Sequence, residues 1–144
     1  MTDDVMGGGA GRRPDQMPPQ SPFSGLTGIE IVSATPDRVV CRMAVTDDLT
    51  NRNGALHGGA VMTLADNAAG TAAFIAIPPG KSNTTIEAKT NFLRGVAVGD
   101  VVTATCETIH WGRTTMVFQI TMTRGDGKTA AVTTQTHMIV DWNR

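Results

Sequence analysis

Residues 58–77 form a run of twenty with a single charged side chain, Asp66, and Pro78-Pro79-Gly80 follows directly. Proline and glycine end helices, so the run predicts one long helix that starts near Gly58. Its length would also permit a membrane span. However, seven of the twenty residues are alanine and three are glycine, and an acid near the middle would be costly in lipid. We therefore predict a buried helix of a soluble domain, with protein on most of its sides.

Strand patterns surround this helix. Residues 29–45 predict two short strands joined around Pro36-Asp37, a turn dipeptide, and residues 46–54 predict a polar loop. After the helix, residues 85–92 alternate and predict a half-buried strand. One predicted face carries Ile86, Ala88, Thr90 and Phe92, and the other carries Thr85, Glu87, Lys89 and Asn91.

Three more strands are expected at 100–110, 114–123 and 129–140, with a hairpin turn at Asp126-Gly127. A long apolar helix needs covering, and a single antiparallel sheet curved around it is the simplest solution. The sequence therefore predicts an α+β fold.

The chain has 144 residues, which is enough for one domain. Residues 1–22 are rich in Gly, Pro and charge, so we expect a disordered leader there and a folded domain over 23–144. No apolar segment follows Arg12-Arg13, which argues against a twin-arginine signal and for a cytoplasmic protein.

The formal net charge of -1 gives no indication of nucleic-acid or membrane binding. Cys41 and Cys106 lie far apart, without metal-ligand spacing and within strand-like runs. We expect buried free thiols rather than a disulfide, and no metal or other cofactor.

The motif "NRNGALHGG" at 51–59 is followed by "AD" at 65–66, "TIEAKTNFLRG" at 85–95 and "HWGR" at 110–113. Together these resemble the hotdog-fold acyl-CoA thioesterases, and the phenylacetate-degradation (PaaI) type in particular, over about residues 25–140. The chain departs from the common pattern at Gly95, where many relatives have proline. The resemblance implies an antiparallel sheet wrapped around a long central helix, a homodimer often paired into a homotetramer, and hydrolysis of acyl-CoA or acyl-carrier-protein thioesters without a cofactor.

The resemblance also implies roles for single residues. Asp66 matches the acid that attacks the thioester or activates water, and Gly58 matches the backbone N–H that polarises the carbonyl. Asn51 matches a loop amide that orients water or substrate, although Asn53 competes for this role. Thr85 matches a Ser/Thr position that assists the water, and strand alternation lets only one of Thr84 and Thr85 face the site.

Elementary chemistry supports the roles of Gly58 and Asp66. Gly58 lies in the first turn of the expected helix, where N–H groups lack intrahelical partners and the helix dipole is positive. A thioester carbonyl placed there would be polarised. Asp66 is expected to be desolvated on its apolar helix, which would raise its basicity. It can act as a general base or as a nucleophile, and the sequence does not separate these routes.

The spacing of these two residues predicts a shared site. Eight residues at 1.5 Å each place Gly58 and Asp66 about 12 Å apart along a helix, whereas a reacting centre must lie within about 3 Å of both groups. Two antiparallel helices related by a two-fold axis would bring Gly58 of one chain level with Asp66 of the other. We therefore expect catalysis across a dimer interface.

The remaining candidates concern substrate binding. Gly59 is expected beside the thioester, and His57 is expected either to line the thioester pocket or to fix the loop by a hydrogen bond. Arg113 is a candidate for CoA phosphates, as is Arg94, with solvated surface charge as the alternative. His110 and His137 are expected at the surface or at an interface. The acyl group is predicted to be aromatic or of medium chain length. The alternative function is a non-catalytic acyl-CoA-binding hotdog protein.

Overall fold

The structure is a computed structural model that describes residues 14–142. Its main elements are two α-helices, α1 (Pro22–Thr27) and α2 (Gly58–Ala76), and six strands: β1 (Glu30–Ala34), β2 (Arg38–Ala44), β3 (Lys81–Phe92), β4 (Val101–Trp111), β5 (Thr115–Thr123) and β6 (Thr129–Asp141). Short 3-10 turns lie at Pro14–Gln16 and Asp47–Leu49.

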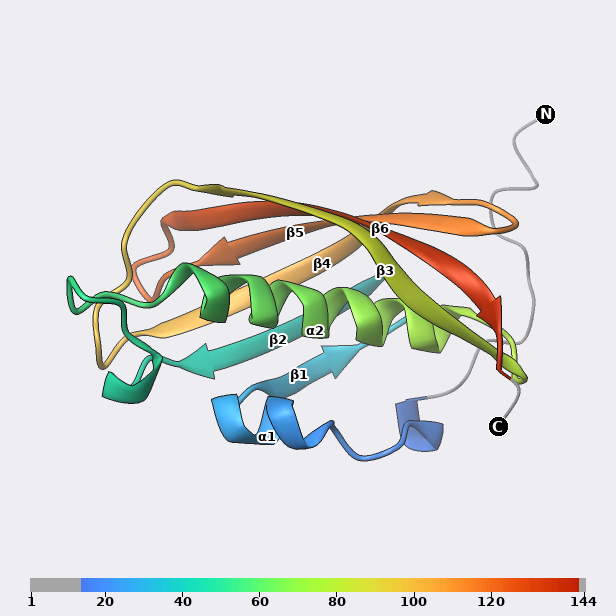
Figure 1. The fold of residues 1–144 in the computed structure, drawn as a ribbon, viewed down its shortest axis with the longest axis horizontal. Helices are drawn as coiled ribbons and strands as arrows, with labels where there is room; N and C mark the ends of the chain where they lie inside the picture. The colour runs from blue at the N-terminus through green and yellow to red at the C-terminus, as the bar shows by residue number, and fades with distance from the viewer. Residues whose placement is uncertain (1–13, 143–144) are drawn as a thin grey trace.

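The six strands form one antiparallel sheet in the order β1-β2-β4-β5-β6-β3. The long helix α2 lies along one face of this sheet, which curves around it (Figure 1). The predicted α+β architecture, the helix, the first two strands and the turn around Asp126-Gly127 are all confirmed. Gly127 has a φ of 81° in that turn, a conformation that favours glycine.

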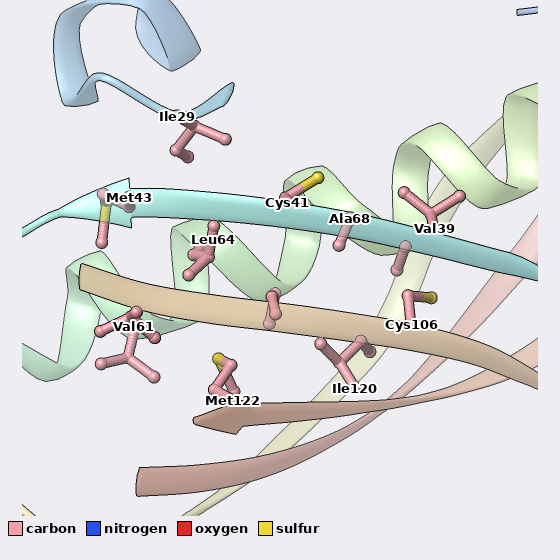
Figure 2. Close-up of a cluster of buried hydrophobic side chains, with 14 of the residues drawn as sticks. Ile29, Val39, Cys41, Met43, Val61, Leu64, Ala68, Cys106, Ile120 and Met122 are labelled. Carbon is pink, nitrogen blue, oxygen red and sulfur yellow. The ribbon is translucent and has the colours of Figure 1, made fainter. Parts of the chain in front are cut away.

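The core fills the space between α2 and the sheet (Figure 2). Buried positions on α2 recur every three or four residues, so one helix face packs inward; they are Val61, Leu64, Ala65, Ala68, Ala69, Thr71, Ala72, Ala73 and Ile75. Alternate residues of β2 meet this face, namely Val39, Cys41 and Met43. Cys41 and Cys106 are buried and free, as expected.

The opposite face of α2 is left uncovered by the single chain. Met62 is 36% exposed and Asp66 is also exposed. The expectation of protein on most sides of the helix is therefore wrong for one chain, because one sheet covers one face only. The expected desolvation of Asp66 is absent for the same reason.

Strand β3 lies at the edge of the sheet, and the half-buried pattern expected for residues 85–92 is wrong. Nearly all of these side chains are exposed, with Phe92 at 55%. The β3–β6 register also shifts between Thr85 and Glu87, which leaves Ile86 as the extra residue of a bulge. The expected strand alternation is broken at this point.

The first thirteen residues, and with them most of the predicted disordered leader, lie outside the described residues. The rest of the predicted leader includes the turn at Pro14–Gln16 and Gln20, whose Nε2 donates to Ile29 O at 2.8 Å. Across residues 14–142, no helix combines the length and apolar character needed to cross a membrane.

Candidate functional site

The N-terminus of α2 presents two glycine N–H groups beside His57. His57 is the N-cap residue, and its Nδ1 accepts a hydrogen bond from the Gly59 N–H at 2.8 Å. The next two N–H groups, of Ala60 and Val61, bond to His57 O. Within residues 14–142, the Gly58 N–H has no acceptor. It is therefore the donor left for a ligand, at the positive end of the helix dipole.

Gly58 and Gly59 both have little room for a side chain. A Cβ at Gly58 would lie 3.3 Å from the Phe92 ring, and one at Gly59 would lie 3.0 Å from His57 Nδ1. Glycine at 59 thus permits the His57 cap, and glycine at 58 lets the backbone approach the aromatic ring. His57 itself is exposed, and the binding of substrate by His57 and Gly59 stays a prediction.

Asp66 lies two turns further along α2 and is paired with β3. Thr85 Oγ1 donates a hydrogen bond to Asp66 Oδ1 at 2.9 Å. The bulge at Ile86 explains why Thr85 reaches the helix. Thr85 pairs with His137 and Ala88 pairs with Gln135, two residues that share a face of β6, so Thr85 lies on the same face as Ala88. The predicted grouping of Thr85 with Glu87 is wrong, although Thr85 rather than Thr84 does meet the acid.

A buried histidine, His137, lies behind Thr85. His137 was expected at the surface or an interface but is only 1% exposed, because β6 is an interior strand and His137 faces inward. Its Nδ1 lies 2.9 Å from Asn83 Oδ1, and its Nε2 lies 2.9 Å from Gln135 Oε1. Nε2 also lies 3.4 Å from Thr85 Oγ1.

Burial lowers the pKa of His137 from its usual 6.5, and the nearby charge of Asp66 opposes this shift. The ring is therefore neutral near pH 7 and stands as a fixed polar support behind the Thr85 hydroxyl. Its ring also meets Phe118 edge-on, with centroids 5.3 Å apart. The signal in the sequence was the period of two in β6, which places Thr133, Gln135 and His137 on one buried face.

The other expected site residues lie apart from the Asp66–Thr85 pair. Asn51 Oδ1 accepts from the N–H groups of Asn53 and Ala55, at 2.9 and 3.2 Å, so this oxygen shapes the loop before α2. Arg113 is exposed in the β4–β5 turn, at the opposite end of the sheet from the N-terminus of α2 (Figure 1). One chain therefore does not bring Arg113 and His57 together.

Gly58 and Asp66 belong to one unbroken helix, so their eight-residue separation is about 12 Å. The single chain thus carries two incomplete groups: a free N–H at the start of α2, and a carboxylate–hydroxyl pair two turns later. Asp66 borders a pocket of about 340 Å³ between α1, α2, β3 and β6.

The family model described as "Thioesterase superfamily" matches residues 53–131. A 1,4-dihydroxy-2-naphthoyl-CoA hydrolase from Listeria monocytogenes is 38% identical over 96 residues, which is 67% of this chain and 77% of the relative. The acyl-coenzyme A thioesterase PaaI of Escherichia coli is 32% identical over 105 residues, 73% of each protein.

Two solved structures extend the comparison. The structure of the E. coli PaaI protein from the phenylacetic acid degradation operon superposes with a TM-score of 0.79 at 28% identity, and covers 84% of this chain and 86% of its own. A hypothetical thioesterase protein from Streptococcus pneumoniae, crystallised with coenzyme A, superposes with a TM-score of 0.73 at 28% identity, over 81% and 88% of the two chains.

The long helix held by a six-stranded antiparallel sheet is therefore the hotdog fold, as expected from the sequence. The chain belongs to the thioesterase superfamily, and it is a thioester hydrolase with a relative of the PaaI type.

Proposed function

We propose that the protein hydrolyses the thioester of an aromatic or medium-chain acyl-CoA, with Asp66 as the general base. The observation that carries this proposal is the Asp66–Thr85 hydrogen bond at the edge of a pocket, on the same helix that leaves the Gly58 N–H free. A carboxylate and a hydroxyl side by side can hold and deprotonate a water molecule. A free N–H at a helix N-terminus can stabilise the oxyanion that forms when this water attacks.

The 12 Å between these groups requires two chains, so the active form is a homodimer in this proposal. The uncovered face of α2 and the exposed edge strand β3 supply an apolar surface, with Met62, Ile86 and Phe92 at 36%, 51% and 55% exposure. Packing two copies about a two-fold axis would cover this surface and create two equal sites. Each site would combine Gly58 of one chain with Asp66 of the partner subunit, and would desolvate the acid.

The reaction then needs no group from outside the protein except water. Asp66 takes a proton from water as the oxygen attacks the carbonyl carbon, and negative charge forms on the carbonyl oxygen at Gly58 N–H. The carbon–sulfur bond breaks next, the proton held by Asp66 passes to the departing sulfur, and the products are the free acid and the CoA thiol. His57 would border the departing sulfur, while Asn51 would orient substrate through the amide nitrogen that the loop leaves unused.

The relatives support the choice of CoA as the carrier. Two are named for hydrolysis of acyl-CoA thioesters, and a similar structure contains coenzyme A. Arg113 of the partner subunit would be the cation for its phosphates. Pairing of dimers into a tetramer and a cytoplasmic location stay predictions.

The test compares wild type with Asp66→Asn on a panel of acyl-CoAs, by release of free thiol. We expect Asp66→Asn to lower turnover by about two orders of magnitude or more, as for loss of a general base. Near-normal turnover in this variant would refute the role of Asp66. If wild type binds acyl-CoAs but cleaves none, the non-catalytic binding protein becomes the better account.

A further inference from the structure

The buried ring of His137 has an amide oxygen against each of its two nitrogens. Nδ1 lies 2.9 Å from Asn83 Oδ1, and Nε2 lies 2.9 Å from Gln135 Oε1. A neutral imidazole carries one N–H, so it can donate to one of these oxygens and not to both. Burial lowers the pKa of His137 and disfavours a second proton. One of the two amides therefore has to turn its NH2 group toward the ring.

The amides and the ring belong to two paired strands, beside the proposed base. Asn83 and Thr85 lie two residues apart on β3, and Gln135 and His137 lie two residues apart on β6. Thr85 pairs directly with His137, which brings His137 Nε2 within 3.4 Å of Thr85 Oγ1. The same hydroxyl donates to Asp66 Oδ1 at 2.9 Å. The Thr85 hydroxyl therefore connects the buried ring to the carboxylate.

The two neutral tautomers of His137 affect this hydroxyl differently. With the proton on Nδ1, the lone pair of Nε2 faces Thr85 Oγ1, and the hydroxyl has two competing acceptors, this nitrogen and Asp66 Oδ1. With the proton on Nε2, the ring donates toward Gln135 Oε1 and Thr85 Oγ1, and the hydroxyl proton is left for Asp66. The position of one proton in the core therefore decides where the hydroxyl points.

The charge of Asp66 favours the proton on Nε2. The carboxylate lies beyond the Thr85 hydroxyl, on the Nε2 side of the ring. An N–H directed toward this negative charge is stabilised, whereas a lone pair directed toward it is repelled. Gln135 then keeps its oxygen toward Nε2, and Asn83 is the amide that turns. Asn83 is half-buried near the start of the edge strand β3, and a half-turn exchanges its oxygen and nitrogen at almost the same distance from Nδ1.

We propose that His137 is a positioning residue for the hydrolysis, held by Asn83 as the Nε2–H tautomer, and that it directs the Thr85 hydroxyl toward Asp66. The hydrogen bonds then run in one direction, from Asn83 Nδ2 to His137, from His137 Nε2 to Thr85, and from Thr85 to the carboxylate. Bonds in such a chain strengthen one another. His137 acts through Thr85 and takes no part in the proton transfer itself. Its effect on catalysis rests on the proposed function, whereas its tautomer is a property of the folded protein.

Nitrogen NMR of the imidazole rings tests the tautomer without any turnover. The chain has three histidines, so isotope-labelled histidine gives few ring signals, and their comparison with His137→Gln identifies those of His137. Couplings to the ring carbon protons show which nitrogen carries the proton. We expect Nε2–H in the wild-type protein near pH 7. A ring protonated at Nδ1, alone or together with Nε2, would overturn the proposal.

Two substitutions of His137 separate the roles of its nitrogens. The amide nitrogen of glutamine can replace Nε2, whereas that of asparagine can replace Nδ1 and does not reach Thr85. We expect His137→Asn to lower kcat for thiol release about fourfold with KM unchanged, as for one weak neutral hydrogen bond, and His137→Gln to lose less than about twofold. Thr133→Val is the matched control and should behave as wild type, because Thr133 is buried on the same face of β6 and its hydroxyl pairs with Thr90 at 2.8 Å.

A double variant tests whether His137 acts through Thr85. Once Thr85→Val has removed the hydroxyl, His137→Asn should cause no further loss, whereas independent losses of about tenfold and fourfold would multiply to about fortyfold. Multiplied losses, or equal losses in His137→Asn and His137→Gln, would overturn the positioning role. Circular dichroism checks that each variant is folded, and the NMR result decides should His137→Asn be unfolded. Absence of thiol release by wild type would refute the proposed function instead, and the tautomer would still decide whether His137 directs the hydroxyl.

Discussion

The hydroxyl of Thr85 provides the sharpest perturbation of the site, because Thr85→Val keeps the shape of the side chain and removes one donor. The lost bond is the 2.9 Å contact to Asp66 Oδ1. Hydrogen bonds to charged groups are worth about 1.5–3 kcal/mol. In the proposed dimer Asp66 would keep the attacking water as a second hydrogen-bond partner, so we take the lower limit, about 1.5 kcal/mol, which corresponds to roughly tenfold in rate.

We therefore expect Thr85→Val to lower kcat about tenfold with little change in KM, because the hydroxyl holds the Asp66 carboxylate toward the attacking water and takes no part in substrate binding. Thr85→Ser should retain most of the activity. Thr84→Val is the matched control, since Thr84 is the neighbouring exposed threonine and should lose less than about twofold. The assay is steady-state thiol release from one acyl-CoA. Equal activity of the Thr85→Val and Thr84→Val variants would refute the role assigned to the hydroxyl.

Two further predictions concern buried groups. Burial lowers the pKa of His137 from 6.5. As the pH falls, the unfolded chain therefore binds a proton at His137 at a higher pH than the folded chain does. The free energy of unfolding from urea titration should therefore decrease as the pH falls from about 6.5, and His137→Gln should reduce this slope; an unchanged slope would contradict the assignment. Burial raises the pKa of Cys41 to about 11 and that of Cys106 to about 12, so a disulfide reagent at pH 7 should label neither thiol in the native protein and both in urea. Rapid labelling of either cysteine without denaturant would contradict the burial of Cys41 and Cys106 in the core.

The fold could be predicted because its signals are local. The nearly uncharged run at 58–77 and the proline pair after it define α2, and alternation with turn residues defines β2, β4, β5 and β6. The incomplete covering of α2 was missed, because the same Ala- and Gly-rich sequence suits contact with the chain's own sheet or with a second copy.

The candidate site combines residues that are adjacent in sequence with residues that only the fold brings together. His57 and Gly58 follow from a motif and from the chemistry of a helix start. The position of Thr85 depends on a bulge at Ile86, and a bulge shifts alternation without any fixed sequence signature. His137 was misplaced because its burial results from pairing with β3 and β5, contacts that are distant along the chain.

The central claim is that one site takes Gly58 from one chain and Asp66 from the partner subunit, and mixing two inactive variants tests it directly. Asp66→Asn removes the acid. Gly58→Pro removes the N–H at the first position of α2, where proline is tolerated, and the extended backbone of His57, with φ -65° and ψ 135°, suits a residue before proline. The Cβ of this proline would lie 3.3 Å from the Phe92 ring, and this ring is 55% exposed and free to shift toward solvent.

Each variant alone should be nearly inactive. After the two are mixed, unfolded and refolded together, half of the dimers should be mixed, and each mixed dimer has one intact site of two. We expect recovery of about a quarter of the wild-type activity per chain. No recovery, with mixed dimers demonstrated by native mass spectrometry, would contradict the shared site.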